Sequence, residues 1–565
     1  MINKPLPHIL PEFRNRSGIA LVNFTQGQPV EIDWQEYSRL ISKTISALHK
    51  IGVKAGSRVA IHSQNNLSWV LLDLACLHLK AVTIPIYNNV LNEELLFILN
   101  DSKAEFLFSS HNSTNFEADI KSCLTLKTLV LLNSDKTDPR SWFQFLDNGH
   151  ESEINFSDLS HYSNDDLVTL VYTSGTTGQP KGVCLTHRQI TSELTEAFSW
   201  AVNSQDRTHN FLPFSHILGR VELWAHAYYG LTMGISEGSD FLRDELKIIK
   251  PTLLVSVPRI FEKFHENIQV RMESLGIKRH LFNWALEVGK KSVGYRLSRR
   301  KLPLDLATQF ELADRLVLNK IRQLFGGSLR FAISGGAPLS KELAEFFYSC
   351  GVLILEGYGL SETTAAIFVN RDQNFKFGTV GHAIGDVKIK LAEDGEILIK
   401  SDKVMTQYYE REEETSQAFE NGWFKTGDIG EILESGHLKI TDRKKDLIKT
   451  SGGKYVAPQK LENLLKENNL ISEALVFGDQ KKYVVTIIQV SPELTSGLSQ
   501  RDLEEKIRLH VAAVNSKLAS FESIKKFAFV RDVWSVDTGE MTPSLKVKRK
   551  FVSQKYADLI EQLYL

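Results

Sequence analysis

Apolar segments of strand length alternate with segments of helical periodicity between residues 40 and 132 of the chain. A stripe of apolar residues every three or four positions predicts a first helix that stops near Gly52, and the shorter apolar runs predict strands. The expected elements are a helix at 40–48, a strand at 58–62, a helix at 69–79, a strand at 81–86, a helix at 94–100, and strands at 105–109 and 128–132. Such alternation indicates parallel sheets covered by helices on both faces. We therefore expect an α/β fold.

A second domain is expected because 565 residues are more than usually fold around one hydrophobic core. Residues 439–450, K-I-T-D-R-K-K-D-L-I-K-T, are dense in charge, which is typical of a solvent-exposed hinge, although a charged surface loop is the alternative. The segments that follow can form a small domain, with strands at 473–477 and 483–489 and a helix at 503–518. We expect a large domain at 1–441, a hinge at 442–445 bounded by Asp442 and Lys445, and a small domain at 446–565.

Composition excludes several classes of function. The net charge of -1 and a pI near 7.0 argue against nucleic-acid binding driven by overall electrostatics. The four cysteines are far apart and lack metal-site spacing, which fits a reducing cytosol. Three prolines interrupt the first 14 residues, and Asp73, His78 and Lys80 interrupt the most apolar long stretch, 69–87. The protein is therefore predicted to be soluble and cytoplasmic, or at most peripheral to a membrane.

Residues 276–318 form a long segment of helical character that is rich in basic residues. Apolar side chains such as Leu281, Trp284 and Tyr295 are interleaved with seven cations, Arg279, Lys290, Lys291, Arg296, Arg299, Arg300 and Lys301. A basic amphipathic helix at 279–301 suits the surface of an anionic membrane, where each cation adds about 1 kcal/mol. The alternative is a solvated helix whose apolar side packs on the core.

Residues 170–182, L-V-Y-T-S-G-T-T-G-Q-P-K-G, read as an apolar strand that enters a polar loop. Glycine lets backbone N–H groups turn toward an anion, the threonine and serine hydroxyls add donors, and Lys181 supplies a mobile charge. The loop therefore suits a polyphosphate, with an ordinary turn between two strands as the alternative. A Walker-type loop requires G-x-x-x-x-G-K-[ST], and Lys181 instead stands between Pro180 and Gly182, so that template fails.

Three further segments carry groups that nucleotide activation needs. F-A-I-S-G-G-A-P-L-S, 331–340, is a strand that ends in a glycine pair, where backbone can approach a flat ring. L-E-G-Y-G-L-S-E-T-T, 355–364, offers the ring of Tyr358 and a hard oxygen from Glu362 for Mg²⁺. N-G-W-F-K-T-G-D-I-G, 421–430, places Asp428 in a glycine-lined turn, where it can accept hydrogen bonds from a ribose diol. Each pattern alone also fits an ordinary turn.

Together these segments resemble the adenylate-forming superfamily, and most closely its AMP-forming long-chain fatty acid:CoA ligases. The resemblance spans about residues 30–550. It implies a large N-terminal domain with parallel and mixed sheets and a small β-barrel-like part, and a small, mobile α+β C-terminal domain. It also implies a set of ATP-binding residues: Thr173, Ser174, Gly175, Thr176, Thr177, Gly178, Lys181, Gly335, Gly336, Ala337, Glu356, Gly357, Tyr358, Gly359, Ser361, Asp428 and Arg443. Within this set, Tyr358 would stack on adenine, and Thr176 with Glu362 would hold Mg²⁺.

The segment M-T-P-S-L-K-V-K-R-K, 541–550, supplies the catalytic cation by the same resemblance, as Lys546. A mobile lysine that bridges the carboxylate and the α-phosphate neutralises the charge that develops in the displacement. Many relatives have glycine before this lysine, whereas this chain has Leu545. The neighbouring Lys548, Arg549 and Lys550 leave the choice of cation open, as does a plain basic tail.

The remaining substrate contacts fall in two segments. In the segment 211–220, F-L-P-F-S-H-I-L-G-R, His216 stands where the family has a histidine near the reacting carboxylate. The resemblance assigns His216, Gly219 and Trp224 to the acyl pocket. It also counts His216 and Thr176 as catalytic. A satisfied core histidine is the alternative. S-G-G-K, Ser451, Gly452, Gly453 and Lys454, matches the segment that borders the CoA tunnel.

The implied reaction uses a fatty acid, ATP with Mg²⁺, and CoA. The carboxylate attacks the α-phosphorus to give an acyl-adenylate, and the CoA thiolate then displaces AMP after the small domain swings. Two other functions remain open: an adenylating enzyme that loads a carrier protein or stops at acyl-AMP, and a nucleotide- or lipid-binding protein without turnover. Dependence on CoA, and turnover itself, separate the three.

Overall fold

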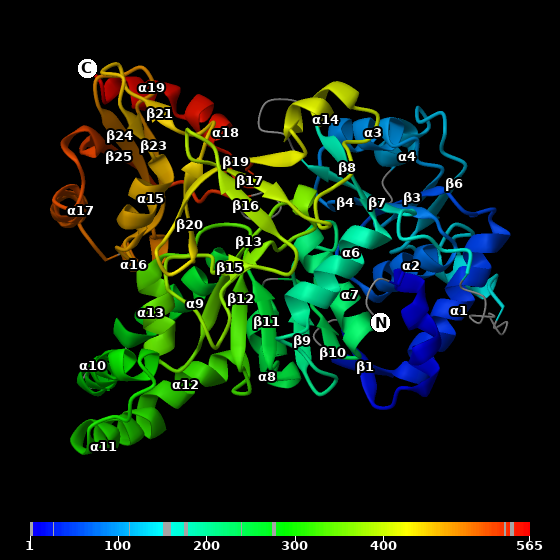
Figure 1. Cartoon of the computed structure of the whole chain (residues 1–565), viewed down its shortest axis with the longest axis horizontal. Helices are drawn as coiled ribbons and strands as arrows, with labels where there is room; N and C mark the ends of the chain where they lie inside the picture. Colours follow the sequence, from blue (N-terminus) through cyan, green and yellow to red (C-terminus); the bar gives the residue numbers. More distant parts are fainter. Residues whose placement is uncertain are drawn as a thin grey trace.

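A computed structural model describes residues 4–25, 28–111, 114–150, 160–173, 179–238, 240–273, 278–495, 497–535, 538–542 and 547–565. Figure 1 shows a broad body made of the N-terminal three quarters of the chain, with the orange and red C-terminal segments packed on one upper corner. No helix among these residues has the length and apolarity that crossing a bilayer requires. Ser174, Gly175, Thr176, Thr177, Gly178 and Lys546, all assigned above to the site, lie outside the described residues.

The first sheet contains the elements expected from the N-terminal pattern. Its strand order is β6-β5-β3-β4-β7-β8, in which β6 to β7 run parallel and β8 pairs antiparallel with β7. The strands are β3 (Arg58–His62), β4 (Val82–Ile86), β5 (Phe106–Ser109), β6 (Thr128–Leu131), β7 (Leu167–Thr173) and β8 (Lys181–Thr186). Helix α1 (Trp34–Lys50) precedes these strands, and the helices between them are α2 (Leu67–His78), α3 (Asn92–Asp101), α4 (Thr114–Ile120) and α5 (Trp142–Asp147). The predicted α/β alternation is confirmed.

Two further sheets complete the centre of the body. One has the order β2-β1-β10-β9, formed by β1 (Ile19–Thr25), β2 (Gln28–Asp33), β9 (Arg207–Asn210) and β10 (Thr232–Ile235). The other, β11-β12-β13-β14-β15, begins with parallel strands and ends antiparallel, so it is mixed as expected. Its strands are β11 (Leu253–Ser256), β12 (Phe331–Ser334), β13 (Ile354–Tyr358), β14 (Phe368–Val369) and β15 (His382–Ala383).

Helix α7 (Ile217–Tyr229) lies between the first sheet and the β9–β10 sheet, in the middle of Figure 1. Its fully buried Arg220 forms an ion pair with Asp73 of α2 and donates to Thr169 of β7 at 2.6 Å. A buried charge of this kind is tolerated only when it is paired and hydrogen-bonded. The pair therefore fixes α7, and with it the residues at its N-terminus, against the strand that leads into the phosphate loop.

The part expected to resemble a small barrel is an antiparallel sheet of order β16-β17-β19-β18, with β20 paired to β19. Its strands are β16 (Lys388–Leu391), β17 (Glu396–Lys400), β18 (Phe419–Glu420), β19 (Trp423–Ile432) and β20 (Leu438–Arg443). Strand β20 runs two residues beyond the large-domain boundary expected at 441. Asp428 of β19 faces Arg443 of β20 in register, so the charged segment begins inside a strand.

The C-terminal segment has its own core, as expected for a small α+β domain. Its sheet, β23-β24-β25, comprises β23 (Ile471–Phe477), β24 (Val484–Val490) and β25 (Ile524–Val530). Helices α15 (Pro458–Lys466) and α17 (Gln500–Asn515) contribute to a hydrophobic cluster that is separate from those of the large domain. The described chain ends in the short helices α18 (Arg549–Lys555) and α19 (Ala557–Gln562).

Candidate active site

A cleft of about 2750 Å³ runs between the large body and the C-terminal domain. Its lining includes Tyr172 and Lys181 from the first sheet, Tyr358 from the mixed sheet, and Lys548 from the C-terminal segment. Pockets for single small ligands are usually about 300–1,000 Å³. This cleft is therefore large enough for several substrates at once, and both parts of the chain contribute to it.

The phosphate-loop segment joins two antiparallel strands. Thr173 at the end of β7 pairs with Lys181 at the start of β8. A strand on each side of the loop differs from the strand-to-helix arrangement of a Walker loop, which agrees with the failure of that template. Thr173 and Lys181 are thus brought to the cleft, while the five residues of this loop that lie outside the described part of the chain stay predictions.

Lys181, Tyr408 and Glu362 lie together on one wall of the cleft. The Lys181 ammonium lies 5.3 Å from the centre of the Tyr408 ring, and the Tyr408 hydroxyl donates to Glu362 Oε1 at 2.9 Å. Burial, reinforced by the Glu362 charge, raises the pKa of Tyr408, so the phenol stays a donor. Glu362 therefore presents an oriented carboxylate beside the phosphate-loop lysine. This oxygen donor fits Mg²⁺, which needs only one or two protein carboxylates when phosphates supply the other ligands.

Tyr358, Asp428 and Arg443 form a chain of contacts at the other side of the cleft. The Tyr358 hydroxyl donates to Asp428 Oδ2 at 2.5 Å, and Arg443 Nε lies 2.8 Å from Oδ1. Burial and the neighbouring Asp428 charge raise the pKa of Tyr358 well above its ordinary value. The glycine-lined turn expected around Asp428 is instead part of strand β19, and both oxygens of Asp428 already have a protein partner.

The glycine-containing turns line the cleft at Gly335, Gly336 and Ala337, and again at Glu356, Gly357, Gly359 and Ser361. Gly359 has no room for a side chain, because a Cβ there would lie 1.4 Å from the Ala365 carbonyl oxygen. Gly336 has a φ of +79°, which side chains rarely allow. Glu356 is buried, and this burial raises its pKa to about 8. These residues are therefore brought to one cleft, where their assignment to ATP stays a prediction.

His216 caps the N-terminus of α7 and lines the cleft. Its Nδ1 accepts from the Leu218 N–H at 3.2 Å, so the neutral ring carries its proton on Nε2. Gly219 and Trp224 are not among the described lining residues: a Cβ on Gly219 would meet two carbonyl oxygens at 2.7 Å, and Trp224 is buried with its indole N–H on Asp73 at 2.8 Å. Their packing gives the acyl-pocket assignment of these two residues no support, because the apolar run after His216 is a core helix.

The described residues on either side of Lys546 reach the cleft. Thr542, Val547 and Lys548 all line it. Burial raises the pKa of Glu94 on α3, and the Lys548 charge opposes this rise, so the C-terminal segment lies close to the large domain. Arg549 and Lys550 line the cleft as well, so Lys548 is one of three described cations of this segment at the cleft, and the role of Lys546 stays a prediction.

The predicted CoA segment does not meet the other site residues. Ser451, Gly452, Gly453 and Lys454 are exposed, and none lines the cleft. They form a turn in which Gly453, with a φ of +73°, donates its N–H to the Thr450 carbonyl at 2.8 Å. In this arrangement of the two parts, the loop faces solvent.

Asp442 corrects the expectation of a solvent-exposed hinge. It is 2% exposed and accepts backbone hydrogen bonds from Arg443 at 2.7 Å and from Gln459 of α15 at 3.0 Å. Burial raises its pKa to about 6. Lys445 is exposed as expected, although partial desolvation lowers its pKa. The charge-dense segment therefore has one buried carboxylate that ties β20 to the first helix of the small domain.

Sequence reasoning missed Tyr408, which orients Glu362, and Glu94, which faces the C-terminal segment. Tyr408 occurs in M-T-Q-Y-Y, a segment with no glycine pattern or charge pair to mark it. Its proximity to the site arises from an isolated β-bridge between Tyr408 and Val183 of β8. Such a pairing across more than 200 residues leaves no local signal in the chain.

Comparison with known proteins agrees with this architecture. Residues 14–409 match the model of the AMP-binding enzyme family, and residues 445–565 match its C-terminal domain. The long-chain-fatty-acid–CoA ligase FadD15 of Mycobacterium bovis is 35% identical over 94% of this chain and 92% of its own length. Long chain acyl-CoA synthetase 1 of Arabidopsis thaliana is 31% identical over 94% and 87%.

Two solved structures share the fold at low identity. The anthranilate CoA ligase AuaEII, in complex with anthranoyl-AMP, superposes with a TM-score of 0.77 at 20% identity, over 100% of this chain and 99% of its own. A fatty acyl CoA synthetase of Mycobacterium tuberculosis gives 0.65 at 22%, over 98% and 99%. With both family models matched over most of the sequence, the chain belongs to the AMP-binding enzyme family.

Proposed function

We propose that this protein is a long-chain fatty acid:CoA ligase that forms AMP and pyrophosphate from ATP. The observation that carries the proposal is the cleft, which gathers Lys181, Glu362, Tyr358, Asp428 and His216 from separate elements. Relatives named as long-chain fatty-acid ligases match the chain over nearly its whole length. Carboxylate activation followed by thioester formation uses each of these groups.

In the first step the fatty carboxylate attacks the α-phosphorus of ATP and pyrophosphate leaves. Thr173, Lys181 and the loop between them receive the phosphates, while Asp428 and Arg443 hold the ribose and Tyr358 faces adenine. Glu362 and Thr176 would hold Mg²⁺ in this proposal, with the Tyr408 hydroxyl orienting Glu362. The bound cation would neutralise negative charge on the phosphates. Lys546 stabilises the charge that develops at the α-phosphate.

In the second step the CoA thiolate attacks the acyl carbonyl and AMP leaves. The loop 451–454 borders the CoA path in this proposal, yet it faces solvent in the present arrangement. We propose that residues 442–445 act as the hinge between a large domain at 1–441 and a small domain at 446–565. Rotation there brings the loop to the cleft and withdraws Lys546, so one small domain serves both steps.

We place the acyl chain beside His216 at the N-terminus of α7. The Nε2–H of the neutral imidazole is oriented by the Nδ1 contact with Leu218 and suits a hydrogen bond to the substrate carboxylate. Apolar neighbours that line the same part of the cleft, Ile217, Leu218 and Ile333, offer surface for an alkyl chain.

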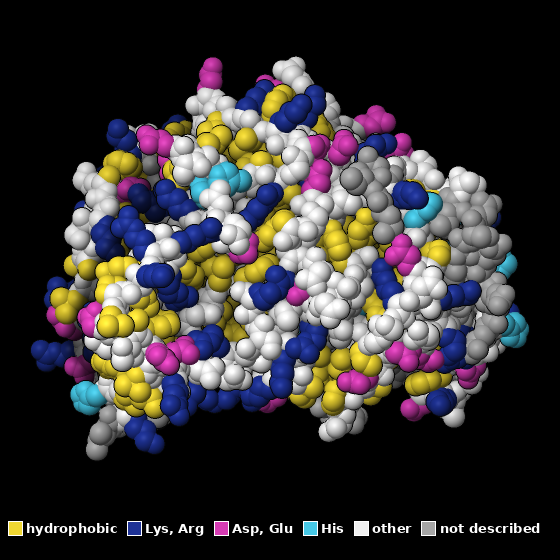
Figure 2. Space-filling model, turned by 60° about the horizontal axis from the view of Figure 1, so that its bottom comes forward, with side chains coloured by type: hydrophobic (Ala, Val, Ile, Leu, Met, Phe, Trp, Pro, Cys, Tyr) yellow, Lys and Arg dark blue, Asp and Glu magenta, His cyan; other side chains and the backbone are white. Residues whose placement is uncertain are grey.

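We also propose that the enzyme acts in the cytoplasm and touches a membrane through α10 (Lys278–Leu297) and the neighbouring α11 (Leu304–Ala313). These helices form the lower left edge of Figure 1. Leu281, Leu297 and Leu304 are exposed there, with side chains 41%, 43% and 86% accessible. Figure 2, which turns this bottom edge forward, shows many Lys and Arg side chains on the same face, with hydrophobic side chains among them. Three of the predicted basic residues are engaged otherwise: Arg296 stacks 4.3 Å from the Tyr348 ring, Arg299 donates to Gln373, and Lys290 pairs with Glu287 at 3.0 Å.

The test is AMP and pyrophosphate release by the purified protein over a series of fatty acids, each with and without CoA. AMP formation that requires CoA and is greatest with long chains is the expected result. Exchange of pyrophosphate without any CoA-dependent product would replace the ligase by a carrier-loading adenylating enzyme. No turnover on any acid would favour a binding protein. Co-sedimentation with anionic against neutral vesicles tests the membrane contact separately.

A further inference from the structure

The chain directly after Glu362 takes an unusual path. Thr364 and Ala365 both lie in the left-handed region, with φ of +56° and +78°. Two consecutive non-glycine residues with this conformation are rare, and such backbone persists only when its surroundings hold it in place. Because Glu362 stands two residues before this turn, whatever holds the turn also sets the position of its carboxylate.

Two contacts from distant segments hold the turn. Glu193 Oε1 accepts from the Ala366 N–H at 3.0 Å, and the Lys403 carbonyl accepts from the Thr364 hydroxyl at 2.8 Å. Glu193 ends helix α6 (His187–Glu193), whereas Lys403 belongs to the segment after β17. The strained turn is therefore held by one hydrogen bond from a helix and by another from an irregular segment.

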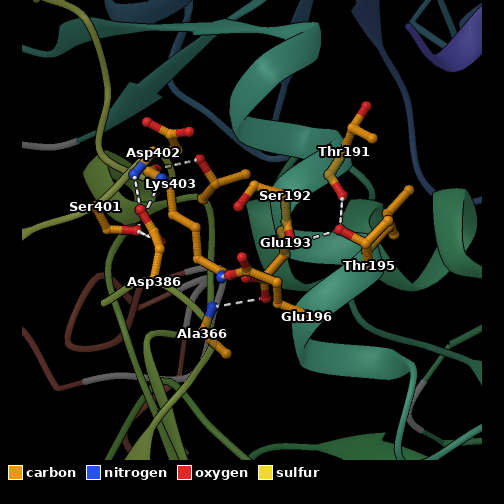
Figure 3. Close-up of polar contacts among 12 residues, drawn as sticks. Thr191, Ser192, Glu193, Thr195, Glu196, Ala366, Asp386, Ser401, Asp402 and Lys403 are labelled. Carbon is orange, nitrogen blue, oxygen red and sulfur yellow. Dashed lines mark hydrogen bonds and ion pairs between the residues drawn. The ribbon is translucent and has the colours of Figure 1, made fainter. Parts of the chain in front are cut away.

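Glu193, Glu196 and Lys403 form a charged cluster beside these two hydrogen bonds. The side chain of Lys403 is fully buried and its ammonium pairs with Glu196. Figure 3 shows both glutamates directed toward Lys403, with the dashed line from Ala366 reaching the same group. Burial raises the pKa of Glu193 and lowers that of Lys403, while each charge opposes the shift of the other. Glu193 and Lys403 are therefore buried, whereas the Glu196 side chain is 27% exposed and partly meets solvent.

A π-helical turn, η2 (Leu194–Phe198), follows α6 directly and contains Glu196. Turns of this type inside helices often mark functional positions. Gly385 leaves the space that the Glu196 carboxylate fills, because a Cβ there would lie within 2.0 Å of its Cδ. The π turn therefore places Glu196 against Lys403, and the absence of a side chain at Gly385 leaves room for the Glu196 carboxylate.

The segment of Lys403 continues to Glu362 itself. Met405 donates its N–H to the Glu362 carbonyl at 2.7 Å, and three residues later the Tyr408 hydroxyl donates to Glu362 Oε1 at 2.9 Å. The segment from 403 to 408 thus contacts Glu362 at its backbone and at its carboxylate. Anchoring Lys403 in the core fixes one end of this segment.

We propose that Glu193 and Lys403 are positioning residues that hold the strained turn after Glu362, and thereby fix the carboxylate that binds Mg²⁺. Neither side chain touches the nucleotide in this account; both act through Thr364, Ala366 and the 403–408 segment. The inference deepens the proposed function and rests on its assignment of Glu362. It identifies metal-site residues that lie outside the motifs of the sequence.

The test compares Glu193→Ala with Glu193→Gln, since glutamine keeps an oxygen for the Ala366 N–H. Hydrogen exchange of the peptide that spans 360–368 should rise at least about fivefold in Glu193→Ala and stay near wild type in Glu193→Gln. The Mg²⁺ concentration for half-maximal pyrophosphate release should rise by a similar factor in Glu193→Ala. Binding of Mn²⁺ with a non-hydrolysable ATP analogue, followed by electron paramagnetic resonance, should weaken in parallel. Lys403→Met should behave like Glu193→Ala.

Glu222→Ala is the matched control. Glu222 is 1% exposed, like Glu193, its Oε2 is buried with no hydrogen-bond partner among the described residues, and burial raises its pKa to about 8. Glu222 lies on α7 and accepts a hydrogen bond from the Thr208 hydroxyl of β9. Loss of this carboxylate should lower thermal stability without changing exchange at 360–368 or the Mg²⁺ requirement.

Equal effects of Glu193→Ala and Glu222→Ala on Mg²⁺ dependence would overturn the inference, as would Glu193→Gln behaving like Glu193→Ala. Glu362→Gln separates this failure from a failure of the proposed function. If Glu362→Gln leaves Mg²⁺ dependence unchanged, the metal assignment itself is wrong. If Glu362→Gln changes it and Glu193→Ala does not, only the positioning role fails.

Discussion

At the scale of single residues, the contact between Tyr358 and Asp428 joins the residues proposed to recognise adenine and ribose. The Tyr358 hydroxyl donates to one oxygen of the carboxylate at 2.5 Å. Arg443 fixes the other oxygen. The three side chains come from β13, β19 and β20, so the orientation of Asp428 is determined before nucleotide arrives. Preorganisation of this kind reduces the conformational entropy that side chains lose when a ligand binds.

Asp428→Asn should raise KM for ATP by about 10- to 100-fold, because a hydrogen bond to a charged group contributes roughly 1.5–3 kcal/mol. Steady-state pyrophosphate release at saturating fatty acid measures this. Tyr358→Phe retains the ring and should change KM less than about fivefold, whereas Tyr358→Ala should match Asp428→Asn. Unchanged ATP kinetics in Asp428→Asn would remove this residue from the nucleotide site.

Asp442 gives a pH dependence of stability. Its pKa is about 6 in the folded protein, above the ordinary value near 3.9, so the folded state binds its proton more tightly. The resulting stabilisation is complete below about pH 4 and is lost as pH rises through about 6. Asp442→Asn does not titrate, so the stability of wild type relative to this variant should fall by about 1–3 kcal/mol between pH 4 and pH 7. Thermal unfolding across this range measures the difference, and a constant difference would contradict the expectation.

The residue types at the site could be predicted from the sequence, but their pairing could not. Glycine, threonine and lysine in 173–182, and the carboxylates at 362 and 428, indicate phosphate, metal and ribose chemistry from composition and order alone. The Tyr358–Asp428 bond joins positions 70 residues apart and depends on how two sheets meet. Trp224 shows the opposite error, since an aromatic in an apolar run suggested a substrate pocket while its N–H belongs to a buried aspartate.

At the scale of elements, helix α9 (Pro258–Glu273) makes the ionic contact between the two parts of the chain. Its Arg259 lies 3.8 Å from Glu473 of β23, and Lys466 at the end of α15 lies 3.5 Å from Glu262 and 3.3 Å from Glu473. Glu473 is 6% exposed, and burial raises its pKa. Two cations and two carboxylates therefore interlock α9 with α15 and β23.

Arg259→Met should loosen this contact, because removing one partner of a buried ionic group leaves charge uncompensated, at a cost of about 3–5 kcal/mol for a fully buried pair and less here. Hydrogen exchange at 466–478 should rise, and proteolysis within 442–454 should become faster. Arg508→Met is the control: Arg508 pairs with Glu505 at 2.7 Å on the exposed face of α17, where such pairs contribute little. Equal proteolysis of the two variants would show that α9 does not hold the small domain.

Element types were predictable where periodicity is strong, and their ends were not. Most helices and strands of the first sheet agree with their apolar patterns to within a few residues, although α1 begins at Trp34, six residues before its expected start. Helix α6 begins at His187 and changes to a π turn at Leu194. Glu196 on that turn packs against Lys403 and Gly385, which are distant in the sequence, so no local pattern specifies the turn. Strand β20 similarly continues into the charged segment because Arg443 pairs with Asp428.

At the scale of the whole molecule, the small domain presents one of its two functional surfaces. Thr542, Val547 and Lys548 line the cleft, while the loop 451–454 is exposed outside it. Ile448 and Val456, which flank the loop, belong to one hydrophobic cluster of the small domain, and Met541 and Val547 pack in another. Under the proposed function, this arrangement would serve the adenylation step, and thioester formation would require the loop 451–454 at the cleft.

This geometry predicts that the two half-reactions separate by mutation. Lys546→Ala should slow pyrophosphate release by about 10²–10³-fold, a typical cost for removing one electrostatic contact to the transition state. Thioester formation from supplied acyl-adenylate and CoA should change less than about threefold, since the lysine has left the cleft by then. Single-turnover assays of each half-reaction measure both. Lys548→Ala is the paired variant, because Lys548 also faces the cleft. A larger adenylation defect in Lys548→Ala than in Lys546→Ala would assign the catalytic role to Lys548. Equal loss of both half-reactions in Lys546→Ala would mean that one arrangement of the domains serves the entire reaction.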